Sequence, residues 1–269
     1  IMNGFFPEIG TVWWAVFFGL IVTILNLFRV DKFGESEFWL SLVKVTALVA
    51  FSVVALLICL GLIGGDGYIG TRILLGSGGF APNGYSAIAL TMVIILVNFQ
   101  GTEIIGLAAG ETADPARSIP TAVRNVTWRI IALYIVPITL LISILPWDHA
   151  SLEESVFAAA LAEHGFTELA ALFSLVVLTA AISCSNSGLY GAARTVHALA
   201  TMGMAPRMLE GLSKQGVPSR AIYASIIFCW GVIGIYAMNP DGALYTYLLA
   251  LSGFSGAMAW ISICWSQYR

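Results

Sequence analysis

The chain has 269 residues, of which 59% are hydrophobic and 10% are charged, with a mean hydropathy of +0.90. Soluble globular proteins are about 45–50% apolar and about 25% charged, so the composition excludes a soluble domain and indicates an integral membrane protein. The net charge of -3 excludes a polybasic nucleic-acid-binding protein. The four cysteines stand singly in apolar stretches, which favours packing over disulfides or metal binding, and we expect no cofactor.

Several apolar runs are long enough to cross a membrane, which takes about 20 residues in a helix. They do not alternate with period two, as the strands of an outer-membrane barrel do. The sequence therefore predicts an all-α, polytopic transmembrane bundle of about seven spans in a single domain. The runs are 11–28, 37–63, 86–109, 127–147, 167–200, 220–238 and 243–265.

The basic residues outside these runs fall almost entirely on one side of the membrane. The other side has only Arg72, while Lys44 and Arg194 lie within spans. Because cytoplasmic loops carry the excess of Lys and Arg, the chain is predicted to start outside and to end in the cytoplasm. The nine residues on the basic side are Arg29, Lys32, Arg117, Arg124, Arg129, Arg207, Lys214, Arg220 and Arg269.

Two connecting segments carry helix-start signals. Ser151 followed by Glu154 fits a capping box and predicts a short amphipathic helix over the outer face. On the inner side, Asp114 as N-cap and Pro115 at the first helical position predict another short element, which Pro120 is expected to interrupt.

The third run is interrupted about halfway by Gly101 and Glu103. A broken helix in a membrane leaves free N–H and C=O groups, which bind a carboxylate and a cation respectively. Glu103 then carries a proton or balances a cationic substrate. The alternative is that Glu103 bonds a neighbouring helix and Gly101 permits close packing. Glu111, eight residues on, forms either a gate or a solvated ion pair.

The remaining polar groups within spans are few. Lys44 either snorkels to the surface or places its ammonium in the bundle interior, where burial disfavours the charged form and promotes proton exchange. In the long fifth run, small polar groups face a ligand or a neighbouring helix. Arg194 and His197 are expected to snorkel or to form a structural ion pair. Ser252 and Gly256 form a small-xxx-small seam. The small polar groups are Ser183, Ser185, Asn186, Ser187 and Gly188.

Sequence motifs of several enzyme classes are absent. No H-E-x-x-H, G-x-S-x-G, Walker A or Rossmann glycine pattern occurs, so nothing indicates an enzyme.

Several ordered motifs carry a resemblance that covers nearly the whole chain. They resemble amino-acid permeases of the amino acid–polyamine–organocation superfamily. The Phe-Gln-Gly-Thr-Glu form is similar to that of the lysine and arginine permeases, with S-methylmethionine permeases as close relatives. The motifs are Phe99-Gln100-Gly101-Thr102-Glu103, Ala109-Gly110-Glu111, Pro115, Ile119-Pro120, Trp128-Arg129, Gly34 to Lys44, Asn186-Ser187-Gly188 with Arg194, Ser252-Gly253, Ala259-Trp260 and Tyr268-Arg269.

The resemblance implies a fold of about twelve spans, the first ten forming two inverted five-helix repeats (the LeuT-type fold). The seven spans then correspond to the fourth to tenth. Residues 1–85 are expected to be the last two helices of the first repeat with an outer loop, and 86–269 the second repeat. Because the family's glycine-rich first span is not in this sequence, we expect the chain to be a fragment of a longer carrier.

The resemblance also implies amino-acid:proton symport across the plasma (cell inner) membrane, with a cationic amino acid and protons as partners. S-methylmethionine or neutral substrates are the alternative, and a seven-helix receptor or sensor is a further one. The sequence leaves the oligomeric state open. The expected coupling residues are Lys44, Glu103 and Glu111, and the expected substrate-binding residues are Phe99, Gly101, Thr102, Glu103, Ser183, Asn186, Ser187 and Ser252.

Overall fold

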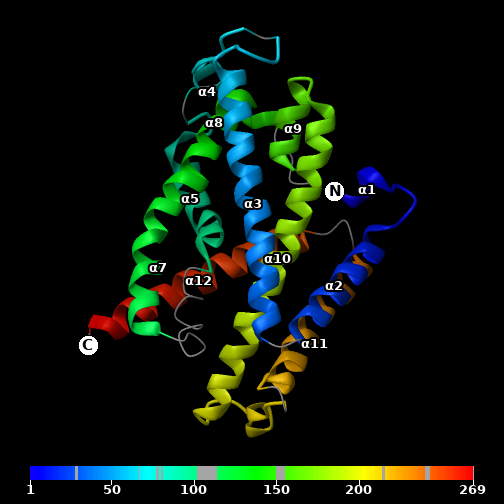
Figure 1. Cartoon of the computed structure of the whole chain (residues 1–269), viewed down its shortest axis with the longest axis vertical. Coiled ribbons are helices and arrows are strands. Elements are labelled where there is room, and N and C mark those ends of the chain that lie inside the picture. Colours follow the sequence, from blue (N-terminus) through cyan, green and yellow to red (C-terminus); the bar gives the residue numbers. More distant parts are fainter. Residues whose placement is uncertain are drawn as a thin grey trace.

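The computed structural model describes residues 1–27, 30–65, 67–76, 79, 81–101, 114–149, 155–213, 216–239 and 243–268. Over this part of the chain every regular element is a helix, which confirms the predicted all-α fold (Figure 1). Five helices of the described part are long and apolar enough to cross a membrane. They are Glu37–Cys59, Ala116–Ile144, Thr167–Thr201, Ser219–Met238 and Leu244–Tyr268.

Two of the seven predicted runs are shorter as helices. The first forms α2 (Thr11–Leu27), which has 17 residues. The third forms α5 (Gly84–Ile95), followed by the 3₁₀ turn η1 (Leu96–Phe99), and its residues 102–109 lie outside the described part. On α2 the exposed residues Trp13, Phe17, Leu20 and Ile24 recur at helical spacing, so one apolar face of this helix points outward, as a lipid-facing helix requires.

The long helices α3 (Val30–Cys59) and α10 (Thr167–Thr201) pack side by side through the middle of the bundle (Figure 1). Near one end of this pair, Phe51 meets Phe157 edge to face with ring centroids 4.9 Å apart, and lies 5.6 Å from Phe173. Phe51 is almost fully buried. This aromatic cluster joins α3 to α10 and to the short helix α9 (Val156–Glu163).

The other half of α10 packs on α2 and α11 (Ser219–Met238) through a second apolar cluster, which includes Leu189, Ala193 and Ile222. With 35 residues, α10 is about 52 Å long. The hydrocarbon core of a bilayer is about 30 Å thick, so α10 is longer than a straight crossing requires.

The prediction that Pro120 interrupts the inner element is wrong. Asp114 does cap α7 (Pro115–Ile130), accepting from the Arg117 N–H at 3.3 Å, and Pro115 lies in its first turn, as predicted. The helix then runs through Pro120 and continues, by way of the π-helical turn η3 (Ile131–Ile135), into α8 (Val136–Ile144). A proline removes only one backbone hydrogen bond of the helix. Because Pro120 lies near the exposed start of a long helix whose later turns keep their hydrogen bonds, the helix continues.

The short outer helix is present as α9, but the residues of the predicted capping box, Ser151 and Glu154, lie outside the described part. Ser155 caps α9, because its Oγ accepts from the Ala158 N–H at 3.4 Å.

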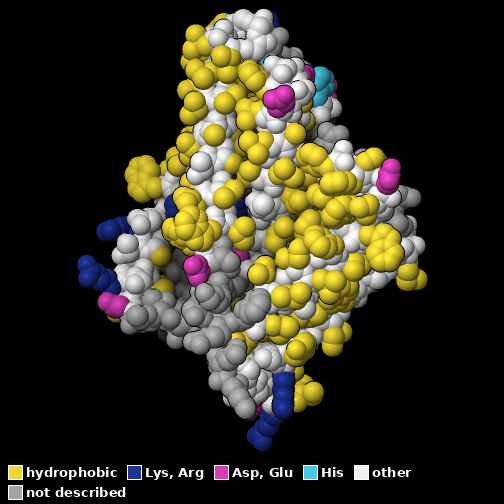
Figure 2. Space-filling view, turned by 45° about the vertical axis from the view of Figure 1, so that its right-hand side comes forward, with side chains coloured by type: hydrophobic (Ala, Val, Ile, Leu, Met, Phe, Trp, Pro, Cys, Tyr) yellow, Lys and Arg dark blue, Asp and Glu magenta, His cyan; other side chains and the backbone are white. Residues whose placement is uncertain are grey.

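Figure 2 shows a broad hydrophobic flank on one face of the molecule, with Lys and Arg side chains mostly at its lower end and left edge. This distribution fits a bundle with its flank in lipid and its charges at the polar margins.

Candidate functional site

The described part of the third apolar run stops being α-helical shortly before the position that the sequence indicates. The α-helical turns of α5 end at Ile95, the tighter turn η1 ends at Phe99, and Gly101 has a φ of +104°. Glycine adopts this left-handed backbone conformation without the strain that a Cβ introduces. The chain therefore leaves the helix axis at Gly101, directly before Thr102 and Glu103, which lie outside the described residues together with Glu111.

Gln100 holds the break against α12 (Leu244–Tyr268). Its amide Nε2 donates to the Ser252 carbonyl at 2.6 Å, and the Ser252 hydroxyl donates to Gln100 Oε1 at 2.8 Å. A Cβ at Gly256 would overlap the Gln100 amide. The small residues that predicted a helix seam thus make room for one side chain from the broken helix. Gln100 was not among the predicted site residues, although an amide within an apolar run was a usable signal.

An aromatic pair covers the other side of the break. The Phe99 ring stacks on Tyr134 with centroids 5.4 Å apart and an interplanar angle of 19°. The Tyr134 hydroxyl donates to the Asn98 carbonyl at 3.1 Å. Tyr134 lies in the π-helical turn η3, and such turns are frequent at functional sites. No sequence pattern distinguished Tyr134 from other aromatic residues of the spans.

Lys44 belongs to a second group of polar residues, which lies between α3 and α10. Its ammonium donates to the Ser183 hydroxyl at 2.8 Å, and Ser183 donates to Glu37 Oε2 at 2.5 Å. Ser183 is fully buried, while Lys44 and Glu37 are half-buried. The Lys44 ammonium therefore contacts a side chain of the bundle interior.

Two asparagines complete this group. Asn186 Nδ2 donates to Glu37 Oε1 at 2.8 Å, and Asn26 Nδ2 donates to Asn186 Oδ1 at 2.7 Å. Asn186 is fully buried and Asn26 is 6% exposed. The bonds connect α2, α3 and α10. We call Asn26, Glu37, Lys44, Ser183 and Asn186 the interior polar network.

The structure thus sorts the described candidates into two places. Lys44 joins Ser183 and Asn186 in the interior polar network, whereas Phe99 and Gly101 lie at the helix break and Ser252 faces it from α12. Sequence reasoning missed Glu37, although it precedes Lys44 by two helical turns and so shares its side of α3. Ser187 is half-buried on α10, one residue beyond Asn186.

Arg194 and His197 lie in the last turns of α10 and contact groups of the described structure. The Arg194 guanidinium lies over the Tyr190 ring, 3.2 Å from its centroid, which is a cation–π contact. His197 Nδ1 lies 3.4 Å from the Leu209 carbonyl. The first contact lies within α10, and the second joins α10 to the 3₁₀ turn η5 (Arg207–Glu210).

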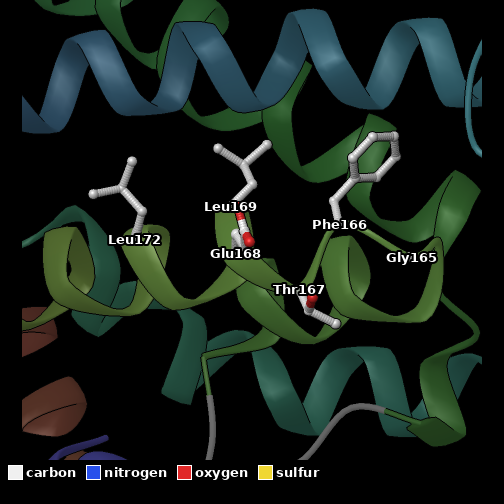
Figure 3. A pocket seen from close by; sticks show the side chains of 6 residues that line it. All are labelled: Gly165, Phe166, Thr167, Glu168, Leu169 and Leu172. Atoms are coloured by element: carbon white, nitrogen blue, oxygen red, sulfur yellow. The ribbon is translucent and has the colours of Figure 1, made fainter.

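A hollow at the start of α10 is separate from both groups. Its lining is Gly165, Phe166, Thr167, Glu168, Leu169 and Leu172 (Figure 3). Phe166 and Leu169 point toward α3 and pack on the apolar core, and Glu168 is the one charged residue of this lining. The hollow lacks the convergent polar groups that a small-molecule site needs. Within the described residues, no three His, Cys, Asp or Glu side chains are grouped to hold a metal ion.

Membrane-length helices and a polar network between them together define a polytopic α-helical membrane protein. The model of the amino acid permease family matches residues 2–269, and the chain belongs to this family.

Three relatives illustrate the range of the similarity. The chain is 38% identical to the lysine-specific permease LysP of Escherichia coli, with 100% of this chain and 56% of the relative covered. It is 36% identical to the gamma-aminobutyric acid permease of Bacillus subtilis, with 100% and 57% covered, and 33% identical to a putative histidine permease of that organism, with 99% and 57% covered. The chain thus spans a little more than half the length of these relatives. These relatives are named permeases, not enzymes, and no solved structure matches the chain.

Proposed function

We propose that the chain is part of a secondary carrier that moves an amino acid into the cell together with protons. The observation that carries this proposal is the helix break at Gly101. In this proposal, backbone N–H groups near the break bind a substrate carboxylate and backbone carbonyls bind a cation. Binding at the break then biases rocking between outward-open and inward-open states. The gene product lies in the plasma (cell inner) membrane, with the start of this chain outside and its end in the cytoplasm, as the loop charges indicate.

The proposed substrate is a cationic amino acid, lysine or arginine. The support is the Phe-Gln-Gly-Thr-Glu motif and the similarity to a lysine-specific permease. A nearly equal similarity to a gamma-aminobutyric acid permease keeps neutral or zwitterionic substrates, and S-methylmethionine, as the alternative. Lysine and gamma-aminobutyric acid both carry a carboxylate and an amino group, so the same broken helix is able to bind either substrate. In this proposal, a side chain near the break determines which of the two substrates binds more tightly.

We assign substrate binding to the broken helix and the helix that faces it. Phe99, Gly101, Thr102 and Glu103 form the first part of the site and Ser252 the second. The Gln100–Ser252 bonds support this assignment because they fix the break relative to α12. Glu103 is the charge partner or proton carrier.

The polar residues of α10 are second-rank substrate contacts in this proposal. Ser183 and Asn186 are already bonded to Glu37, so a substrate reaches them only when those bonds open. Ser187 follows on the next position of the helix. Lys44 is a coupling residue, supported by its bond to buried Ser183, and Glu111 is a further coupling candidate.

The test uses the whole gene product reconstituted in vesicles whose external solution is more acidic than the interior, so that protons are driven inward. Labelled lysine should accumulate, and arginine should compete better than gamma-aminobutyric acid, histidine or S-methylmethionine. Glu103→Gln should abolish lysine uptake, whereas Glu103→Asp should retain part of it. Unchanged uptake by Glu103→Gln contradicts the assignment, and uptake that stays pH-dependent after Lys44→Ala removes Lys44 from coupling. Ligand binding without accumulation would instead favour a receptor or sensor.

A further inference from the structure

We infer that Lys44, Ser183 and Glu37 form a proton relay, in which Glu37 receives the proton that Lys44 gives up. This inference rests on the proposed proton coupling and extends it to a residue that the sequence did not single out. Two consecutive hydrogen bonds carry it: Lys44 Nζ to Ser183 Oγ at 2.8 Å and Ser183 Oγ to Glu37 Oε2 at 2.5 Å.

The two hydrogen bonds point in one direction. A hydroxyl donates one proton and accepts through its lone pairs. Ser183 accepts from the ammonium and donates to the carboxylate, so the arrangement is already that of a relay before any proton moves. Its distances are those of good hydrogen bonds, and the bond to the carboxylate is at the short end expected for an O–H donor to a charged acceptor.

The receiving carboxylate is held in place from its other side. Asn186 donates to Glu37 Oε1 at 2.8 Å, and Asn26 in turn donates to Asn186 Oδ1 at 2.7 Å. Both asparagines are buried. Because Oε1 and the Asn186 amide have fixed partners, Glu37 keeps Oε2 aimed at Ser183. The network therefore orients a carboxylate, and hydrogen-bond networks of this kind are strongest where water is excluded.

The proposed step balances in atoms and charge. The Nζ–H bond of Lys44 breaks and leaves its electron pair on nitrogen, while the Ser183 oxygen gains that proton. Ser183 releases its original proton to Glu37 Oε2, so an O–H bond forms there and the serine is unchanged. An ammonium and a carboxylate thereby become a neutral amine and a neutral acid. The transfer removes two charges from half-buried positions between apolar helices, where charge is less stable than in water.

On α3 itself, the ionisable residue of the described part nearest to the relay in sequence is Glu35, which is exposed two residues before Glu37. α8 and η3 pack on α3; α8 carries no ionisable side chain and η3 carries Tyr134. α2, which contributes Asn26, also carries none. On α10 the ionisable residues nearest in sequence are Cys184, Tyr190, Arg194 and His197, and Arg194 lies over the Tyr190 ring. Glu37 precedes Lys44 by seven residues, about 10 Å along α3. With the proposed orientation, the relay leads toward the cytoplasm.

The test compares proton-driven accumulation with substrate exchange. The whole gene product is placed in vesicles with the membrane potential clamped at zero and the outside about one pH unit more acidic than the inside. If one proton accompanies each substrate molecule, this gradient supports up to about tenfold substrate accumulation. Equal substrate on both sides and no pH gradient then give the exchange rate, which needs no net proton movement. Glu37→Gln and Ser183→Ala remove the acceptor and the bridging hydroxyl, and Ser183→Thr keeps the hydroxyl.

We expect Glu37→Gln to lower the accumulation ratio to about one while exchange of labelled substrate continues. Because Ser183 is also a proposed substrate contact, Ser183→Ala is compared by its steady-state accumulation ratio alone, which should also fall to about one, and Ser183→Thr should restore it. A purely structural role predicts that accumulation and exchange fall together, and that result overturns the relay, as does full accumulation by Ser183→Ala. If Glu37→Gln does not fold, the Ser183 pair decides the question. If the unchanged protein exchanges substrate but ignores the pH gradient, the proposed proton coupling itself fails, which is a different result from a coupled protein with no relay.

Discussion

Gln100 and Ser252 exchange two hydrogen bonds across 152 residues of sequence, the amide donating to the serine carbonyl and the serine hydroxyl donating back. This reciprocal pair lies directly beside Gly101, where the backbone leaves the helix. The contact fixes the broken helix to α12 at one depth and one rotation. It therefore fixes the position of the backbone next to Gly101 relative to α12.

Gln100→Leu should reduce transport strongly, because a side chain of similar size removes both hydrogen bonds. Each bond contributes about 0.5–1.5 kcal/mol, and the Ser252 hydroxyl would also lose its acceptor. The measurement is the initial rate of labelled substrate uptake by the whole gene product. Gln267→Leu is the matched control, since Gln267 is an exposed glutamine of α12, the helix that carries Ser252. Equal rates for the two variants would contradict the role given to Gln100.

Gly256→Ala should destabilise the protein, because the added Cβ overlaps the Gln100 amide. Overpacking of this kind costs about 1–3 kcal/mol, and the expected readout is a lower thermal unfolding temperature of the purified protein in detergent. Gly234→Ala is the control, because a Cβ at this helical glycine of α11 meets nothing within 4 Å. The prediction fails if the two alanine variants unfold at the same temperature.

Tyr134→Phe and Tyr134→Ala should separate the two contacts of this residue. The phenylalanine variant keeps the stack on Phe99 and loses the bond to the Asn98 carbonyl, whereas the alanine variant loses both. A stacked pair contributes about 0.5–1.5 kcal/mol beyond its buried area. We expect substrate KM to rise in the order unchanged protein, Tyr134→Phe, Tyr134→Ala.

Tyr245→Ala serves as the control for the Tyr134 series, because Tyr245 is an exposed aromatic residue near the start of α12. A KM that rises equally in Tyr245→Ala would show that loss of any aromatic residue weakens binding. Only the Tyr134 variants should alter the kinetics if the stack positions the break.

Local features of the fold were predictable because they depend on residues close together in the sequence. Asp114 followed by Pro115 specifies a helix start, and Gly101 within an apolar run specifies a break, whatever the rest of the bundle does. The continuation of α7 through Pro120 was missed for the opposite reason. A proline signals the loss of one hydrogen bond, but the neighbouring turns decide whether the helix continues.

The candidate site was only partly predictable. Lys44, Ser183 and Asn186 were each recognised as polar groups within apolar runs, but nothing in the sequence paired them. Glu37 bonds residues 146 and 149 positions away. The span that carries it is apolar on nearly every side, so no hydrophobic face indicates which way its few polar residues turn.

The sequence by itself determined the membrane class, most of the spans, the family resemblance and the location of the helix break. Those conclusions depend on composition, on run length and on motifs a few residues long, which are complete in any local window. The tertiary structure decided that Gln100 contacts Ser252, that Tyr134 covers Phe99 and that Glu37 meets Ser183 and Asn186. Such pairings depend on the depth and rotation at which separate helices pack, and only the folded bundle fixes these two quantities.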